Sequence, residues 1–154
     1  MATFGQIISS LVIGAGKSVR RNAGDTDFEA ITPLVSREVF VPINGSTALT
    51  TSDKGYFRVP TSMNGMNLIA VSAMCQTASS SGTPTFTIKR GSTNMLSTNL
   101  TIDANETDSS TAVTPAVIDT ANDDVSTGQQ IEVACSVAGT GTLYAGVSLT
   151  FQLP

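Results

Sequence analysis

The sequence segment that most resembles a chemical motif is Gly14-Ala15-Gly16-Lys17-Ser18, which ends like the phosphate-binding loop of nucleotide-binding proteins. That loop needs a glycine at position 11, where this chain has Leu11. It also needs an amphipathic helix after the Lys-Ser pair, because the N-terminus of that helix holds the phosphate. Residues 19–31 lack the apolar periodicity of such a helix. We therefore expect no nucleotide site here.

A second candidate motif is the segment 103–108, which carries oxygen-bearing side chains at alternating positions, as the start of a calcium loop does. The calcium pattern requires glycine at its sixth position and glutamate at its twelfth, and this chain has Asp108 and Thr114 there. Turn carboxylates exposed to solvent are the simpler interpretation. A calcium ion held between this loop and Asp123-Asp124 stays an alternative, and our prediction is that no metal is bound.

Histidine is absent from the chain, which removes the commonest acid–base catalyst and metal ligand. Catalytic triads and zinc sites built on imidazole are therefore excluded. The chain has no Trp and only two Tyr, and its acids fall mostly in turns, so paired carboxylates across a groove are not indicated. Eight basic and 12 acidic side chains give a net charge of −4, which argues against nucleic acid as a partner. We expect a binding protein without catalytic residues or cofactor.

The two cysteines, Cys75 and Cys135, lie in hydrophobic runs that have the composition of strands. Two cysteines in 154 residues do not make a disulfide framework, so we predict two buried free thiols, with a cross-sheet disulfide as the alternative. The apolar run Ile7–Ile13 has no basic residue before it and is shorter than the roughly 20 residues of a membrane span. We expect it to be neither a signal peptide nor a membrane anchor.

From Glu38 onward, short runs of β-branched and aromatic residues alternate with Gly, Ser, Asn and Pro clusters, which predicts strands and turns. Alternation of apolar and polar residues is clearest in 85–90, 131–135 and 147–151. Only 13% of residues are charged, while the chain holds 22 Thr and 18 Ser. We predict an all-β protein, with a jelly-roll-like antiparallel β-sandwich over 38–154. The predicted strands are 38–43, 55–59, 67–77, 83–90, 99–103, 112–119, 129–137 and 143–153, with a shorter one at 47–51 and an exposed excursion at 105–111.

Residues 1–37 differ from the rest of the chain and predict an extended N-terminal arm without evident partner strands, with one helical turn at most near Phe4–Leu11. The arm combines apolar side chains with a basic cluster. An unpartnered apolar segment is better buried than exposed, so we expect the arm to extend onto a neighbouring subunit, and packing back on the sandwich is the alternative. The predicted interface residues are Phe4, Ile7, Ile8, Leu11, Val12, Lys17, Arg20 and Arg21.

Several segments of the C-terminal half together form a pattern that resembles small auxiliary virion proteins of tailed bacteriophages. The resemblance covers roughly residues 67–153, and Asn22–Ile31 is similar to the lead-in of such domains. The segments that carry it are Thr85-Phe86-Thr87-Ile88-Lys89-Arg90-Gly91, Met95-Leu96-Ser97-Thr98, Leu100-Thr101-Ile102-Asp103, Pro115-Ala116-Val117-Ile118-Asp119 and Gly139-Thr140-Gly141-Thr142-Leu143-Tyr144-Ala145-Gly146-Val147.

This resemblance implies a β-sandwich that decorates capsids as a cement protein or head-fibre base, usually as a homotrimer, with no catalytic motif. We accordingly expect a structural protein of the virion, located on the capsid surface. Its partner would be the major capsid protein or another virion protein, with no nucleic acid and no membrane involved. A tail or fibre-base component is one alternative. A carbohydrate- or receptor-binding module, with its specificity in the loops at one end of the sandwich, is another.

Overall fold

The structure, a computed structural model, describes residues 18–21, 28–31 and 35–154. The chain forms two compact units, Met1–Val35 and Ser36–Pro154. In the first unit, β1 (Ser18–Arg21) and β2 (Phe28–Ile31) pair as an antiparallel hairpin. No partner strands were evident from the sequence for these residues, and in the structure the two short strands pair with each other. The helical turn predicted near Phe4–Leu11 lies outside the described residues.

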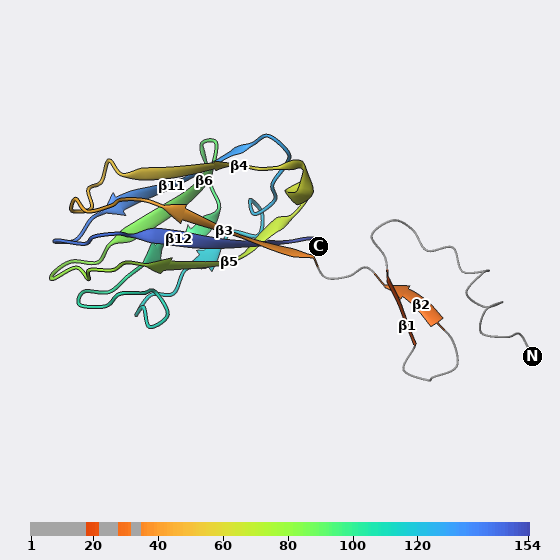
Figure 1. Cartoon of the computed structure of the whole chain (residues 1–154), viewed down its shortest axis with the longest axis horizontal. Coiled ribbons are helices and arrows are strands. Elements are labelled where there is room, and N and C mark those ends of the chain that lie inside the picture. The colour runs from red at the N-terminus through yellow and green to blue at the C-terminus, as the bar shows by residue number, and fades with distance from the viewer. Residues whose placement is uncertain (1–17, 22–27, 32–34) are drawn as a thin grey trace, which may run out of the picture. The chain divides into compact units, whose positions relative to one another are not determined.

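One sheet of the second unit contains three antiparallel strands in the order β3-β12-β5 (Figure 1). The last strand of the chain is therefore the central one, and Leu149 pairs with Val39 on one side and Val71 on the other. The side chains of β12 alternate between the core and the outer face: its odd-numbered residues are buried, and its even-numbered residues after Gly146 are half-buried. The bounds are β3 (Ser36–Pro42), β5 (Asn67–Met74) and β12 (Gly146–Gln152).

The other sheet has the order β4-β11-β6-β7, and β9 also pairs with β6. Two further short strands, β8 and β10, pair with each other. The only helical element among the described residues is the 3-10 turn η1 (Thr61–Met63). The strand bounds are β4 (Lys54–Arg58), β6 (Thr85–Arg90), β7 (Thr93–Asn94), β8 (Leu96–Thr98), β9 (Leu100–Thr101), β10 (Val117–Ile118) and β11 (Gln130–Val137).

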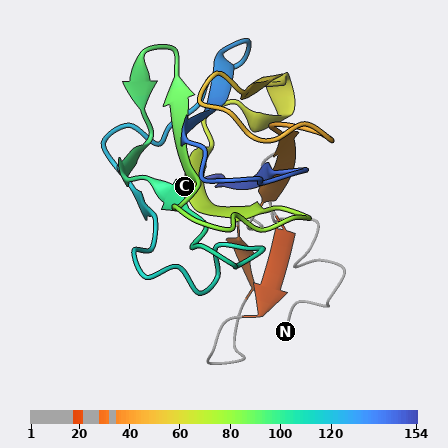
Figure 2. The ribbon, with the colours of Figure 1, turned by 90° about the vertical axis from the view of Figure 1, so that its left-hand side faces the viewer.

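The free side of β5 is covered by the segment that connects β9 to β11. Isolated bridges join Met74 to Asp108 and Asn67 to Asp124 at the two ends of β5, and β10 lies beside β5 between them. One layer is thus formed by β3, β12 and β5 with β10 beside β5, and the other by β4, β11 and β6 with β9 paired to β6. The predicted all-β class and jelly-roll-like antiparallel sandwich are thereby confirmed. Figure 2 shows the sandwich end-on.

The core lies between the two sheets and is formed by side chains from both. Because successive strand residues point to opposite faces, each sheet contributes every second residue to it. Among the residues of the sandwich, the buried side chains are apolar except for Ser79, Asp123 and Thr142, and both cysteines belong to the core. Its largest fully buried side chains are Phe86, Phe151, Met66, Leu68, Ile88, Met95, Ile102, Ile131, Leu149, Val41, Val59 and Val125.

The predicted strands differ from the observed ones mainly where strands are short. No strand forms at 47–51, and the predicted strand 112–119 shrinks to Val117–Ile118. The structure adds β7 and β8, which were not predicted, because two or three residues carry too little alternation to be recognised. Within the described residues, no helix is long and apolar enough to cross a membrane.

Candidate functional site

The predicted arm interface falls largely outside the described part of the chain. Arg20 and Arg21 are in β1, where their backbone partners are Glu29 and Phe28 of β2. These two positions thus belong to a paired hairpin. The remaining predicted interface residues lie outside the described residues, namely Phe4, Ile7, Ile8, Leu11, Val12 and Lys17.

The outer face of the β4-β11-β6 sheet carries most of the positive charge of the sandwich. Lys54, Tyr56 and Arg58 alternate with buried or half-buried residues along β4, and Tyr56 is half exposed. The β11 residue Glu132 is the register partner of both Tyr56 and Lys89, and the Lys54 ammonium lies 3.2 Å from its carboxylate. Exposed ion pairs of this kind contribute little stability. This face offers a tyrosine ring among three cations and one anion.

The outer face of the β3-β12-β5 sheet is built differently, mostly from apolar and hydroxyl side chains, with the exposed Glu38 on β3. Ser148 of β12 pairs with Phe40 of β3 on one side and with Ser72 of β5 on the other. The Phe40 ring is 52% exposed and lies directly over Gly146, since a Cβ added at that glycine would collide with the ring. Met74, the β5 partner of Gly146, is also half exposed.

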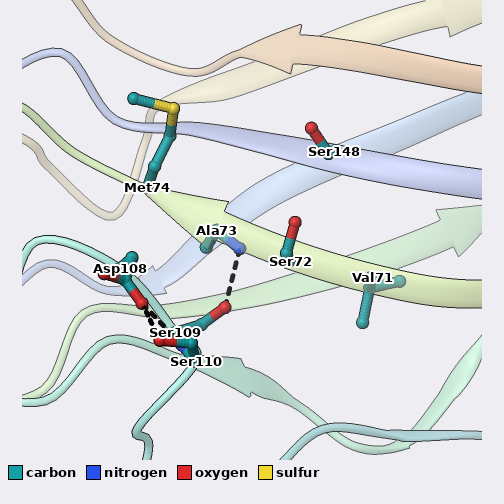
Figure 3. Close-up of a pocket in the computed structure, with 8 residues that line it drawn as sticks. All are labelled: Val71, Ser72, Ala73, Met74, Asp108, Ser109, Ser110 and Ser148. Carbon is teal, nitrogen blue, oxygen red and sulfur yellow. Dashed lines mark hydrogen bonds between the residues drawn. The ribbon is translucent and has the colours of Figure 1, made fainter.

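Beside β5, this face continues into a hollow of about 280 Å³ between the sheet and the 108–110 loop (Figure 3). Four of its lining residues are serines, and Asp108 is its one charged residue. Arginine and lysine are absent from the lining. We call it the serine hollow, and it is lined by Val71, Ser72, Ala73, Met74, Asp108, Ser109, Ser110 and Ser148.

The loop side of the serine hollow is held by hydrogen bonds to the sheet and within the loop. The Ala73 amide donates to the Ser109 hydroxyl at 2.9 Å, and the Ser109 amide donates to the Ala73 carbonyl at 3.0 Å. The Ser110 amide donates to Asp108 Oδ1 at 2.8 Å, and the Ser110 hydroxyl donates to the same oxygen. These two bonds lower the pKa of the Asp108 carboxyl below its ordinary value, because they favour the charged form.

Sequence reasoning found only part of this site. The 105–111 excursion was predicted from its polarity, and in the structure Glu106 is half-buried while its neighbours on both sides are exposed. Phe40, Ser72 and Ser148 were not singled out. Alternation along a strand shows that these residues face outward, but it does not show which residues of other strands lie beside them. Only the register brings the three side chains into one row.

A larger hollow, of about 480 Å³, lies at the start of β11 and is lined by Arg90, Gly91, Gln129 and Gln130. Arg90 is the one cation of this lining, and it is already ion-paired. Arg90 Nη1 lies 2.6 Å from the Asp124 carboxylate and 2.5 Å from the backbone carbonyl oxygen of Asp124. The side chain of Gln129 likewise accepts a hydrogen bond from the Ser126 amide at 2.7 Å. The Arg90 contacts fasten the 124–130 segment to β6, and the Gln129 bond lies within the segment itself.

The acidic side chains of the calcium segment 103–108 bond to residues of the same loop, and Asp124 is ion-paired with Arg90 of β6. Asp103 accepts from the Val113 amide at 2.8 Å, and Glu106 pairs with the Thr111 hydroxyl. Within the described residues, no group of three or more Asp, Glu, Cys or His side chains is arranged to hold a metal ion. The calcium alternative gains no support there.

Both cysteines are buried and free, as predicted. Burial raises the pKa of the Cys75 thiol, and the nearby Asp108 charge adds to the effect. Burial and the charge of Asp53 raise the pKa of Cys135 to about 11, and the Cys135 thiol donates to the Val137 carbonyl at 3.3 Å. A nucleophilic cysteine needs a lowered pKa. The raised pKa values therefore argue against a nucleophilic role for these thiols and for a packing role in the core.

Comparisons with protein-family models, with curated proteins and with solved structures find no match for this chain.

Proposed function

We propose that this protein is a structural virion protein of a tailed phage, a decoration or cement protein that stabilises the capsid shell by binding rather than by catalysis. The observation that carries the proposal is the division of the chain into a hairpin-bearing unit, Met1–Val35, and a separate sandwich, Ser36–Pro154. A protein that binds many identical sites benefits from a folded body with a distinct anchoring segment.

The composition supports the same proposal. A chain that is rich in Ser and Thr and has only 13% charged residues offers few strong ionic contacts, so the apolar and basic residues of the N-terminal unit supply the binding. At about 25 cal/mol per Å², burial of a few hundred Å² by that unit would contribute several kcal/mol before the cost of ordering it. In a homotrimer, three such units would bind one shell site with increased avidity. The partner in this proposal is the major capsid protein.

The sandwich makes a clean truncation possible. The sandwich, residues 36–154, contains its own core, whose buried apolar side chains lie between Val41 and Phe151. Deleting residues 1–21 would remove β1 and leave β2 without its partner. Deleting residues 1–35 removes the whole unit and is the better variant.

The test compares the full chain with the 36–154 truncation in co-sedimentation with capsid shells that lack this protein. We expect the full chain to bind shells and the truncation to stay in the supernatant while its circular dichroism spectrum remains that of a folded β-sandwich. A third variant, Lys17→Gln with Arg20→Gln and Arg21→Gln, separates the basic cluster from the rest of the unit and should weaken binding, more so at low salt. Light scattering of the full chain should give the mass of a trimer.

A folded full chain that does not bind shells would overturn the decoration proposal. Binding to isolated tails in the same assay would instead support the tail or fibre-base alternative. Equal shell binding by the full chain and the truncation would show that the sandwich, not the N-terminal unit, carries the interface.

A further inference from the structure

We propose that the serine hollow and the adjoining Phe40 ring bind a neutral carbohydrate. This site lies on the sandwich, and the proposal does not depend on the proposed virion function. It rests on three observations: a row of side chains across the sheet, a carboxylate with an available oxygen, and the absence of cations from the hollow.

The row consists of Phe40, Ser148 and Ser72, which are register partners on three adjacent strands. Neighbouring strands are about 4.8 Å apart, so the row spans on the order of 10 Å, and one flat ligand can contact all three side chains. Figure 3 shows the Ser72 and Ser148 hydroxyls projecting from the same side of the sheet as Met74. Each hydroxyl can both donate and accept, which suits ligands whose own groups are hydroxyls.

The carboxylate of Asp108 adds the one strong acceptor. Both of its hydrogen bonds from Ser110 reach Oδ1, which fixes the group and leaves Oδ2 for a ligand hydroxyl. A charge-assisted hydrogen bond of this kind is about twice as strong as a neutral one. Two hydrogen bonds between Ser109 and Ala73, one accepted by the Ser109 hydroxyl and one by the Ala73 carbonyl, hold this loop against β5 before any ligand arrives.

The charge of the hollow restricts the ligand. Its lining holds one carboxylate and no Lys or Arg, so a phosphate, sulfate or carboxylate group would be repelled. Phe40 and Met74 are each 52% exposed, and they offer apolar surface to the C–H face of a sugar ring. Hydroxyl partners, one acceptor and a small apolar face together match a neutral sugar.

The backbone of β12 makes the aromatic contact possible. Gly146 is the β12 residue beneath the Phe40 ring, and any side chain there would displace the ring. Because the colliding atoms belong to the outer end of the half-exposed Phe40 side chain, the ring can move at small cost in stability. Gly146→Ala therefore tests the position of the ring without deleting it.

The experiment is saturation-transfer difference NMR on the full chain with D-glucose, D-galactose, D-mannose and N-acetyl-D-glucosamine, each at millimolar concentration. We expect signal from at least one sugar. Loss of each serine hydroxyl, in Ser72→Ala and Ser148→Ala, should weaken binding about fivefold. Asp108→Asn should weaken it by at least as much, and Gly146→Ala should reduce saturation of the sugar C–H protons.

The matched control is Ser136→Ala, which removes a hydroxyl from an exposed position on β11, in the other sheet. It should leave the sugar signal unchanged. Absence of saturation transfer from all four sugars to the folded full chain would overturn the proposal. So would a signal that survives the combined Ser72→Ala and Ser148→Ala variant, because the sugar would then be bound elsewhere. Neither result bears on shell binding, which is measured separately.

Discussion

The ring of Phe57 meets the ring of Phe151 edge to face, with centroids 5.9 Å apart and ring planes at 67°. Phe57 belongs to β4 and Phe151 to β12, so this contact joins the two sheets of the sandwich. Phe151 is fully buried, whereas Phe57 is half-buried at the edge of the core. The pair holds β4 against the sheet that contains the last strand of the chain.

A double-mutant cycle on this pair should reveal its coupling. We expect Phe57→Leu and Phe151→Leu each to lower the free energy of unfolding, with Phe151→Leu the more damaging because that ring is fully buried. The coupling energy should be about 0.5–1.5 kcal/mol beyond the loss of area. Urea denaturation of the four proteins measures it. Tyr56→Leu, on the outer face of the same strand, serves as the control, and strict additivity of the two core substitutions would contradict the prediction.

Gly55→Ala tests the close approach of β4 to β3. An added Cβ would collide with the Val41 side chain and with the Pro42 carbonyl oxygen, and the backbone there cannot give way cheaply. We expect a loss of about 1–3 kcal/mol of unfolding free energy, as for other overpacked sites. Gly45→Ala is the matched control, since nothing lies within 4 Å of a Cβ at that position. Equal stabilities of the two variants in thermal denaturation would show that β3 and β4 are farther apart.

The thiols provide a third prediction, because the pKa of Cys135 is raised to about 11 and that of Cys75 is also raised. A raised pKa favours the neutral thiol in the folded chain. The contribution of the buried thiols to the free energy of unfolding is therefore fully present below the pKa of about 8.5 that a thiol has in the unfolded chain. It is lost as the pH rises toward 11, because the thiols of the unfolded chain ionise first. Iodoacetamide at pH 8 should modify neither cysteine in the folded protein and both in urea. Mass spectrometry measures this, and rapid modification of the folded chain would contradict it.

The lowered pKa of Asp108 makes a fourth prediction, since its cause is a single neighbour. Ser110 donates its amide and its hydroxyl to that carboxylate, so Ser110→Ala should raise the pKa of Asp108 toward its ordinary value of about 3.9. The stability from this contact is present above that value and is lost as the pH falls through the lowered pKa.

The pKa of Asp108 is measured by NMR titration of the carboxyl carbon. Ser97→Ala removes a hydroxyl that donates to the Val117 carbonyl rather than to a carboxylate, so it should leave the titration unchanged. A Ser110→Ala variant that titrates like the original protein would show that another group sets the pKa of Asp108.

Strands that contain a long run of alternating apolar and polar residues could be predicted from the sequence, and short strands could not. Runs such as Thr85–Arg90 and Gln130–Val137 were predicted closely because each residue's side of the sheet is a local property. The hairpin of Ser18–Arg21 and Phe28–Ile31 was missed. Each of its strands is only four residues long, too short for a period of two to stand out.

The sequence by itself determined the all-β class, the burial of both cysteines and the lack of any imidazole chemistry, because composition and alternation act within a few residues. Only the tertiary structure decided which residues of different strands lie side by side. Ser148 meets Ser72 and Phe40 only because the last strand enters between β3 and β5, and Asp108 reaches the same face only because its loop bonds to Ala73. These pairings join residues 36 to more than 100 positions apart, and no local pattern encodes them, since backbone hydrogen bonds between strands do not depend on side-chain identity.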